Sequence, residues 1–380
     1  MCIRDRYLFM QEKRLDLGKL ATFVPNKGLP VYNWFYYKEG YARDLVMLLL
    51  DRYAPEGGVN VMDPFVGSGT TLLACKERGI DSYGFDVSPL AVLASRAKTN
   101  DYEPDELKAA IKALSRSKFR RPDLSSVPQN VKRYFNRHTL EDVLFFREQL
   151  KGFSGEVLDF LKLGLVTSAT RCSYMYKDGA VVKVRKKPVP VFRKFYMRAL
   201  RKMLKDISKL ETKPCQTFVE EGDSRSLSID SGFIDLVITS PPYLNKIEYT
   251  RIYGVEEFLF FGQPIEKRGM RAFIGRDPET KPVFPDQELP PIADAYFSDM
   301  RRTLSEMRRA CRPGAVLAFV VGDGCFPERV VHVDTLLPKL ADKEGFETEN
   351  IYVLNERQCT RNRVEKVGQM EECLIVMRKR

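Results

Sequence analysis

The fold is decided by residues 59–100, VNVMDPFVGSGTTLLACKERGIDSYGFDVSPLAVLASRAKTN, in which two short apolar runs alternate with two segments of helical spacing. The pattern predicts a strand over 58–65, a helix over 69–79, a strand over 81–87 and a helix over 88–100, with Ser88 as its N-cap and Pro89 at its first position. Strand, helix, strand and helix in this order begin a doubly wound parallel sheet. We therefore expect an α/β fold.

The same alternation resumes after a long interruption. Residues 101–212 show mostly helical patterns and predict a helical insertion. Beyond it, strands are predicted over 216–223, 233–240, 315–323, 346–354 and 371–379, with helices near 292–312 and 332–345. Because the last two strands follow each other directly, we expect an antiparallel hairpin at the edge of a mostly parallel sheet.

The pattern divides the chain into four regions. Residues 1–30 are interpreted as a leader, and within it MCIRDR, residues 1–6, resembles a translated sequencing-library end and is interpreted as an artefact. Residues 31–100 and 213–380 are interpreted as the two halves of one domain. Residues 101–212 are the insertion between these halves.

The composition indicates an ordinary globular protein. The chain has 380 residues, is 44% hydrophobic and has no apolar run near the roughly 18 residues that a membrane span needs, so we expect no membrane segment and a cytoplasmic location. Its eight cysteines show no CxxC spacing, and only two histidines could join them as ligands. We therefore predict neither a bound metal nor a disulfide framework.

The segment DPFVGSGTT, residues 63–71, lies between a predicted strand and a predicted helix, where a doubly wound sheet binds its ligand. Gly67 and Gly69 permit a tight turn, and the N-terminus of the helix favours an anion such as a carboxylate. The loop lacks the lysine of a phosphate-binding P-loop. Asp86 follows at the spacing at which an acid typically meets ribose hydroxyls. A cofactor with a ribose and a small zwitterionic tail fits this pattern.

Four ordered motifs resemble those of the S-adenosylmethionine-dependent amino-methyltransferases of DNA. They are DPFVGSGTT at 63–71, FDVSP at 85–89, GDSRSL at 222–227 and TSPPY at 239–243. Residues 33–45, NWFYYKEGYARDL, resemble the aromatic and basic motif that covers the cofactor in that family. The resemblance spans about 31–100 and 213–380. It implies a Rossmann-like methyltransferase fold that binds S-adenosylmethionine.

The resemblance also implies which residues contact the cofactor. The glycine loop would surround the methionine moiety, the acid after the second strand would bind the ribose, and the GDS motif would lie near the adenine. The cofactor-binding residues implied in this way are Tyr36, Asp63, Phe65, Gly67, Gly69, Thr70, Asp86, Val87, Asp223 and Ser224.

The catalytic tetrad Ser240, Pro241, Pro242 and Tyr243 fits the needs of methyl transfer to an amine on a base. The nitrogen of such an amine is a poor nucleophile because its lone pair is delocalised into the ring. Ser240 Oγ and the Pro241 carbonyl can accept its protons, the prolines fix the backbone, and Tyr243 can stack on the base. Because a base inside a duplex cannot reach such a pocket, we expect base flipping.

The serine of the tetrad favours one target. In the family that the motifs resemble, Ser before PPY usually accompanies the N4 amine of cytosine, whereas Asp or Asn usually accompanies adenine. We therefore favour site-specific N4-cytosine methylation of DNA, with N6-adenine methylation, an RNA base amino-methyltransferase and a non-catalytic nucleic-acid-binding relative as alternatives. The sequence has no complete nuclease motif, so the expected role is restriction-modification or epigenetic marking, with a separate restriction endonuclease as a candidate partner.

Basic residues are concentrated in the insertion. The formal net charge is +11, and the segment 181–205 contains ten Lys or Arg residues and no acid. This basic stripe favours DNA as a partner, with a solvated basic face as the alternative. The predicted DNA contacts are Lys183, Arg185, Lys186, Lys187, Arg193 and Arg198.

Acidic residues follow the tetrad. Glu248, Glu256 and Glu257 lie in or near a predicted helix, beside Tyr253 and Phe258. Direct methyl transfer requires no pair of carboxylates. We therefore predict that these acids form a solvated helix face.

Overall fold

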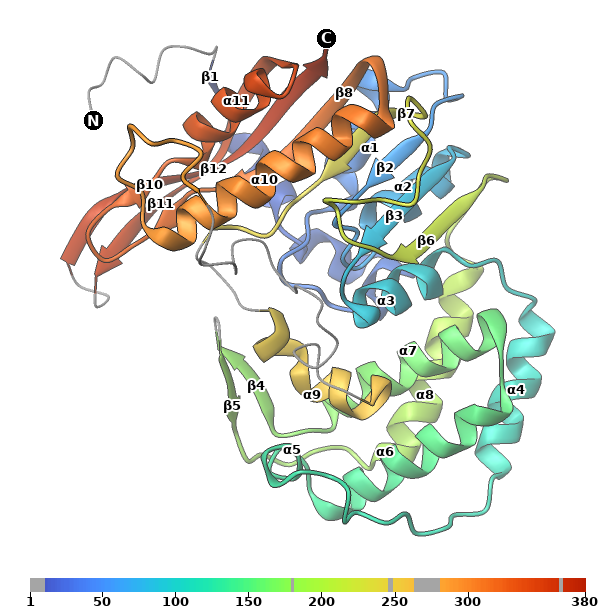
Figure 1. The fold of residues 1–380 in the computed structure, drawn as a ribbon. Helices are drawn as coiled ribbons and strands as arrows, with labels where there is room; N and C mark the ends of the chain where they lie inside the picture. Colours follow the sequence, from blue (N-terminus) through green and yellow to red (C-terminus); the bar gives the residue numbers. More distant parts are fainter. Residues whose placement is uncertain (1–10, 179–180, 245–248, 263–280, 362–364) are drawn as a thin grey trace.

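The structure, a computed structural model, describes residues 11–178, 181–244, 249–262, 281–361 and 365–380. An eight-stranded sheet with the strand order β1-β11-β12-β8-β7-β2-β3-β6 forms its centre (Figure 1). Neighbouring strands from β8 to β6 run parallel, whereas β12 is antiparallel to both β8 and β11. The predicted α/β fold, with its mostly parallel sheet and terminal antiparallel hairpin, is confirmed, although β1 rather than the hairpin forms the edge of the sheet.

The strand order places a switch point at the centre of the sheet. The strands are β1 (Gln11–Lys13), β2 (Val61–Asp63), β3 (Ser82–Asp86), β6 (Thr217–Glu221), β7 (Ile234–Thr239), β8 (Cys311–Gly322), β11 (Phe346–Arg361) and β12 (Glu365–Lys379). The chain runs from β2 to β3 and β6 on one side and returns to β7 and β8 on the other. The carboxyl ends of β2 and β7, where the DPF and TSPPY motifs begin, therefore lie side by side.

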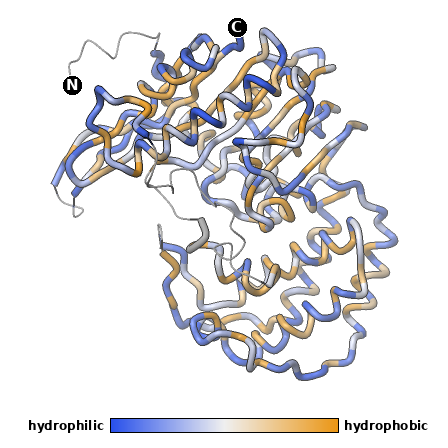
Figure 2. The backbone as a smooth tube through the Cα atoms, viewed as in Figure 1, coloured by the Kyte–Doolittle hydropathy of each residue, from blue (hydrophilic) through white to orange (hydrophobic). Residues whose placement is uncertain are grey.

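Helices cover both faces of this sheet. The helices α1 (Arg43–Tyr53) and α2 (Thr70–Arg78) pack on one face, and α10 (Pro291–Ala310) and α11 (Val333–Lys343) pack on the other. Consecutive residues of β2 point to opposite faces, so Val61 joins the first core and Met62 the second. Because both faces are covered, the central strands are hydrophobic along most of their length (Figure 2).

The insertion is mostly helical, as predicted, and shares its core with the main domain. It contains α4 (Pro104–Arg116), α5 (Gln129–Lys132), α6 (Arg137–Gln149), the 3-10 helix η5 (Leu150–Gly152), α7 (Gly155–Arg171) and α8 (Phe192–Ile207). A hairpin of β4 (Met175–Asp178) and β5 (Val181–Val184) adds two strands that the sequence did not predict. Apolar residues of α3 (Pro89–Thr99) and α9 (Tyr249–Phe261) complete the same core. The insertion is therefore packed directly against helices from both halves of the main domain.

Residues 11–30 differ from the leader that the sequence predicted. They form β1, which pairs with β11, and the 3-10 helices η2 (Leu15–Ala21) and η3 (Val24–Gly28), followed by η4 (Tyr32–Trp34). Phe23 and Asn26 within this stretch are buried. Short strands and 3-10 helices have no periodic sequence signal, which explains the wrong prediction. Residues 1–6, interpreted as an artefact, lie outside the described residues.

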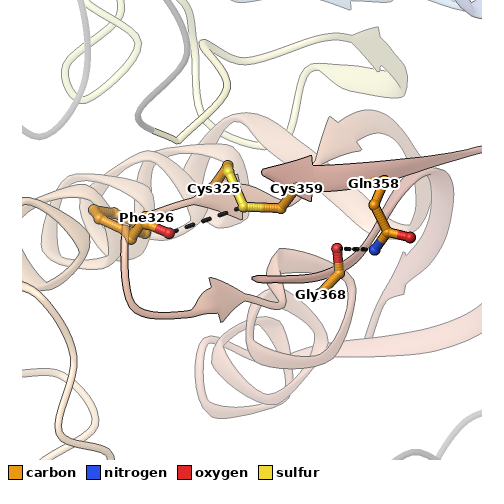
Figure 3. Close-up of a disulfide and its surroundings, with 5 residues drawn as sticks. All are labelled: Cys325, Phe326, Gln358, Cys359 and Gly368. Atoms are coloured by element: carbon orange, nitrogen blue, oxygen red, sulfur yellow. Dashed lines mark hydrogen bonds between the residues drawn. A yellow bond between two sulfur atoms is a disulfide. The ribbon is translucent and has the colours of Figure 1, made fainter. Parts of the chain in front are cut away.

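A second short hairpin follows the central sheet. It consists of β9 (Gly324–Cys325) and β10 (Val330–Val331), directly after β8. A disulfide between Cys325 and Cys359 links it to β11 (Figure 3). This disulfide contradicts the prediction that no disulfide framework exists. The sequence could not reveal it because the two cysteines lie far apart in the chain and meet only through the sheet topology.

Candidate active site

A cavity of about 860 Å³, partly open to solvent, lies at the switch point of the sheet. We call it the central cavity. It is lined by most of the predicted cofactor residues, namely Asp63, Phe65, Gly67, Thr70, Asp86, Val87, Asp223 and Ser224, and by Ser240 and Pro242 of the tetrad. The fold therefore brings residues of all four sequence motifs into one space.

Two glycines shape the loop between β2 and α2. Gly67 has a φ angle of 52° and Gly69 one of 76°, both in the left-handed region that glycine favours. A Cβ atom on Gly67 would lie 3.2 Å from the Tyr37 ring, beside the central cavity, whereas a Cβ on Gly69 would lie 2.9 Å from the Ser95 Cα on α3. Gly67 therefore keeps the loop open toward the cavity, and Gly69 allows the loop to pack on α3.

Asp63 anchors this loop to the tetrad strand. Its buried carboxylate accepts hydrogen bonds from Tyr41 Oη at 2.9 Å, Thr71 Oγ1 at 2.8 Å and Thr239 Oγ1 at 2.6 Å. Burial raises the pKa of the Asp63 carboxyl, and these three hydrogen bonds oppose the shift. Since Thr239 immediately precedes the tetrad, Asp63 fixes the end of β7 relative to the end of β2.

Asp86 lies at the end of β3, at the wall of the central cavity. Its carboxylate accepts hydrogen bonds from the backbone N–H of Gly67 at 3.0 Å and of Ser88 at 2.9 Å. Burial raises the pKa of Asp86 to about 6, although these two hydrogen bonds act in the opposite direction. A carboxylate has about four acceptor sites, so this group retains capacity for the hydroxyls of a ribose.

Asp223 and Arg225 form the side of the cavity beyond β6. The Arg225 guanidinium binds both oxygens of Asp223 and reaches Asp299 Oδ1 at 2.8 Å. Partial burial acts to raise the pKa of Asp223, but the hydrogen bonds and charge of Arg225 outweigh it and lower the pKa overall. Asp223 is therefore held ionised in a fixed orientation, and Arg225 is a cavity residue that the sequence did not identify.

The aromatic segment, residues 33–45, lines the central cavity through residues other than the predicted one. Tyr36 is 41% exposed and packs edge-on against Phe23, outside the cavity. Its neighbour Tyr37 lines the cavity, together with Glu39 and Tyr41. This stretch is largely irregular, so no strand or helix period could show which aromatic ring faces inward.

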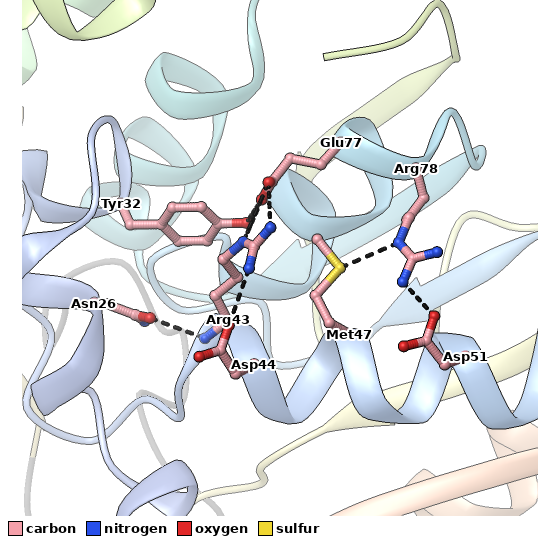
Figure 4. A network of polar contacts seen from close by, with 8 residues as sticks. All are labelled: Asn26, Tyr32, Arg43, Asp44, Met47, Asp51, Glu77 and Arg78. Carbon is pink, nitrogen blue, oxygen red and sulfur yellow. Dashed lines mark hydrogen bonds and ion pairs between the residues drawn. The ribbon is translucent and has the colours of Figure 1, made fainter. Parts of the chain in front are cut away.

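A polar network holds the aromatic segment against α2 (Figure 4). Asn26 Oδ1 accepts the Arg43 backbone N–H at 2.8 Å, and the Asn26 amide donates to the Tyr41 carbonyl at 3.0 Å. The Arg43 guanidinium binds the Glu77 carboxylate on α2 at 2.6 Å, and Tyr32 Oη donates to the same carboxylate. The network therefore ties the segment that lines the cavity to the helix that follows the glycine loop.

Lys98 supports the loop from inside the protein. This lysine on α3 is 3% exposed, and its Nζ donates to the carbonyls of Ser68 at 2.9 Å and Phe35 at 3.4 Å. Burial lowers the pKa of Lys98 to about 7. Lys98 joins the glycine loop to the aromatic segment. No sequence motif indicates this role, so the sequence could not reveal it.

The tetrad residues line two different cavities. Ser240 and Pro242 line the central cavity, whereas Tyr243 lines a neighbouring cavity of about 420 Å³ that is also partly open to solvent. Its other lining residues are Leu244, Gly322, Asp323, Cys325, Arg357, Met370, Glu371 and Glu372. Pro241 is buried. The four tetrad residues therefore do not share one cavity.

The acids on α9 differ from the solvated face that the sequence predicted. Glu256 and Glu257 are each 2% exposed. Glu256 Oε1 lies 2.9 Å from Lys177 Nζ on β4, and Glu257 Oε1 accepts a hydrogen bond from Ser88 Oγ at 3.1 Å. These contacts pack α9 between the insertion and the start of α3, which is why its acids are buried. Glu248 lies outside the described residues.

The same helix reaches the aromatic segment. The Tyr253 ring stacks on the Tyr37 ring, with centroids 5.4 Å apart and planes at 8°. Tyr253 Oη donates to Glu39 Oε2 at 3.1 Å, and Lys177 Nζ lies 3.6 Å from the Tyr253 ring centroid. The hairpin of the insertion is thus in contact, through α9, with the wall of the central cavity.

The basic stripe occupies β5, the following loop and α8. Lys186 and Lys187 are exposed in the loop, and the Arg185 guanidinium lies 5.6 Å from the exposed Tyr176 ring. Lys183 pairs with Asp178 at 2.6 Å across the hairpin. The exposed Arg198 lies over the Phe195 ring.

Arg193 is placed differently from the other stripe residues. It is half-buried, lies against three phenylalanine rings and pairs with Asp142 at 3.3 Å. These contacts explain the half-buried position of Arg193 at the insertion core without any phosphate partner. The exposed members of the stripe are therefore the better candidates for phosphate contacts.

Two overlapping groups near the second cavity have donor atoms within 4.8 Å of one another. They are Asp323, His332 and Asp334, and Asp334, Glu371 and Cys373. His332 Nδ1 lies 3.0 Å from Asp323 Oδ2, and the Gln11 amide donates to Asp334 and Glu371. This polar network accounts for the groups, and we assign no metal to them.

Comparison with known proteins adds a family match and several relatives. Residues 23–96 match a family of N6 and N4 methyltransferases described as DNA methylase. The Type II methyltransferase M.BsoBI from Geobacillus stearothermophilus is 26% identical to this chain, and the match covers 94% of this chain and 86% of the length of M.BsoBI. The Type II methyltransferase M.AvaI from Nostoc sp. is 25% identical over 88% of this chain and 83% of its own. The matched family segment contains the aromatic segment, the glycine loop and Asp86.

Solved structures resemble the chain only distantly. A SAM-dependent methyltransferase from Methanosarcina mazei covers 87% of this chain and 96% of its own, with 10% identity and a TM-score of 0.33, which is too low to draw on. Within the described residues, no helix combines the length and apolarity needed to cross a membrane. The family match and the Type II relatives together show that the chain is similar to DNA amino-methyltransferases.

Proposed function

We propose that the protein transfers a methyl group from S-adenosylmethionine to the exocyclic N4 of a cytosine flipped out of duplex DNA. The observation that carries this proposal is that Ser240 and Pro242 line the same cavity as the glycine loop and Asp86. Residues suited to an amine and residues suited to a cofactor therefore face one space. Direct methyl transfer requires this proximity, because the reacting atoms must be in line at about 3–3.5 Å.

The lining of the central cavity fits the cofactor. Gly67 leaves the loop open beside Tyr37, Thr70 begins α2, and Asp86 has acceptor capacity for ribose hydroxyls. We assign the methionine end to the glycine loop, the ribose to Asp86 and the adenine end to the side formed by Asp223 and Ser224. When bound, S-adenosylmethionine supplies a methyl group activated by a sulfonium centre.

The tetrad prepares the amine. Ser240 Oγ and the Pro241 carbonyl accept hydrogen bonds from its two protons and draw the nitrogen lone pair out of conjugation with the ring. The prolines contribute no N–H that would compete for these acceptors, and they fix the backbone. The proton that the nitrogen loses after transfer passes through one of these acceptors to solvent. The choice of cytosine over adenine rests on Ser240 at the first tetrad position.

The exposed part of the basic stripe supplies the DNA contacts in this proposal. Lys183, Arg185, Lys186 and Lys187 lie on the hairpin or in its following loop, and Arg198 lies on α8. The hairpin contacts α9, which reaches the central cavity, so bound DNA would lie near the site of chemistry. A separate restriction endonuclease and a cytoplasmic location complete the proposal, since the similar proteins are Type II methyltransferases.

Expression in a host that lacks DNA modification tests the proposal. Nucleoside mass spectrometry of the genomic DNA should detect N4-methylcytosine, and methylation-aware sequencing should place it at one short recognition sequence. If 6-methyladenine alone appears, the choice of base is wrong although the tetrad chemistry stands. Methylated nucleosides found in RNA but absent from DNA would favour the RNA alternative, and their absence from both would refute the proposed function.

A further inference from the structure

The ring of Tyr243 is held from several sides at the second cavity. A Cβ atom on Gly322 would lie 2.9 Å from Tyr243 Cδ2, so the ring packs directly on the backbone at the end of β8. At the far end of the ring, Tyr243 Oη donates a hydrogen bond to Glu372 Oε1 at 2.9 Å. The prolines that precede Tyr243 restrict its backbone. The position of the ring is therefore determined by contacts as well as by its own rotamer.

The sheet fixes the position of Glu372 beside Tyr243. In the register of the sheet it lies between Gly322 on β8 and Asn355 on β11. Glu372 is 7% exposed, and its second carboxylate oxygen, Oε2, accepts a hydrogen bond from Asn355 Nδ2 at 2.8 Å. Arg357 NH2 lies 3.8 Å from the same oxygen. Burying a carboxylate is costly unless it is paired and hydrogen-bonded, and these partners provide that compensation.

Through its hydrogen bond to Tyr243, Glu372 can influence how the target base is oriented. Tyr243 lines the second cavity, whereas Ser240 and Pro242, its near neighbours in the chain, line the central cavity. A base that enters beside Tyr243 must present its amine toward Ser240, so the tilt of the ring sets the direction of the nitrogen. An error of about 1 Å in such a position can cost roughly a hundredfold in rate.

We propose that Glu372 is a positioning residue for methyl transfer, which fixes the ring of Tyr243 in the wall of the second cavity where the flipped base enters. The proposal rests on the proposed function. It adds a residue outside the motifs, on a strand 129 residues from Tyr243 in the sequence. Glu372 acts through Tyr243 and does not touch the reacting atoms.

A double-mutant cycle with Tyr243→Phe and Glu372→Ala tests the proposal. Each single variant should lower kcat about tenfold on a duplex that carries the sequence found by methylation-aware sequencing, because each removes the same hydrogen bond. The double variant should be no slower than the slower single variant, since the two residues act as one unit. Affinity for S-adenosylmethionine, measured by calorimetry, should remain within about twofold in all three.

Conservative variants and a control separate positioning from a general effect on stability. Glu372→Gln keeps an acceptor for Tyr243 Oη and should restore kcat to within about threefold of the wild type. Glu347→Gln changes an exposed acid on β11 and should leave kcat unchanged. If Glu372→Ala does not fold by circular dichroism, the cycle is repeated with Glu372→Gln, which should then show a smaller loss than Tyr243→Phe and no loss beyond it in the double variant.

The outcomes distinguish this proposal from the proposed function. Additive losses in the cycle, or full activity of Glu372→Ala in an active enzyme, would overturn the positioning role alone. A wild-type protein that transfers no methyl group to DNA would overturn the proposed function and this proposal with it. A pyrrolocytosine probe at the target position adds a direct readout, because its fluorescence on binding should differ between the wild type and Glu372→Ala if the base is placed differently.

Discussion

Asp86 should make a pH-dependent contribution to cofactor binding. Its pKa is raised by burial to about 6, so the group is mostly protonated at pH 5 and mostly ionised at pH 7. Because the ionised carboxylate is the better acceptor for ribose hydroxyls, affinity for S-adenosylmethionine should rise about tenfold between pH 5 and pH 7. Isothermal titration calorimetry across this range measures the effect.

The variant Asp86→Asn supplies the comparison for that experiment. It should bind the cofactor roughly ten- to a hundredfold more weakly at pH 7, and its affinity should not vary between pH 5 and pH 7. Asp105→Asn, an exposed acid on α4, should retain the wild-type profile. A pH dependence that persists in Asp86→Asn would assign the titration to another group and contradict the role of Asp86.

Ser240 should affect chemistry and leave cofactor binding intact. Ser240→Ala removes one of the two acceptors proposed for the amine, so kcat should fall by roughly ten- to a thousandfold. Affinity for S-adenosylmethionine should change by less than about threefold. Single-turnover kinetics and calorimetry check the two expectations, with Ser115→Ala on the exposed face of α4 as control. A kcat near the wild-type value would remove Ser240 from the mechanism.

At the scale of elements, the β4–β5 hairpin and its following loop should account for much of the salt dependence of DNA binding. Changing Lys183, Arg185, Lys186 and Lys187 together to Gln should weaken binding. It should also reduce the slope of log affinity against log salt by roughly 2–4, because each phosphate contact contributes about 0.9 to that slope. Fluorescence anisotropy at several salt concentrations measures it.

A matched set of charges lies elsewhere on the insertion. Lys112, Arg116, Lys118 and Arg120 are exposed on α4 and the residues after it. The helix α4 and the hairpin lie on opposite sides of the insertion (Figure 1). Replacing these four residues by Gln should leave the slope nearly unchanged. Equal slopes for the two quadruple variants would mean that the stripe is a solvated face without a specific role in DNA binding.

At the scale of the whole molecule, the sequence predicted what depends on local periodicity and on spacing within short motifs. The strand and helix order around the glycine loop, and the meeting of that loop with Asp86 and Ser240, follow from such patterns together with the rules of parallel sheets. The sequence did not predict contacts between distant residues. Tyr37 rather than Tyr36 lines the cavity because η4 and irregular backbone orient the segment, and Glu256 is buried because the insertion packs on α9.

The same reason explains the remaining differences. The Cys325–Cys359 disulfide, the pairing of β1 with β11 and the contact between Tyr243 and Glu372 all depend on the complete sheet order. Each joins residues that no local pattern connects. Tertiary packing therefore determines which side chains surround the motifs, whereas the motifs themselves are visible in the sequence.

The central claim is methyl transfer to DNA. It is tested most directly by incubating the purified protein with S-adenosylmethionine that carries a labelled methyl group and measuring the label in nucleic acid. With unmodified duplex DNA that contains the recognition sequence, the label should appear in the DNA and co-migrate with N4-methylcytosine after digestion to nucleosides. Ser240→Ala should incorporate label at least tenfold more slowly under the same conditions. Label that appears in RNA alone, or no incorporation by a wild-type protein that binds the cofactor, would contradict the proposal that this chain is a DNA cytosine-N4 methyltransferase.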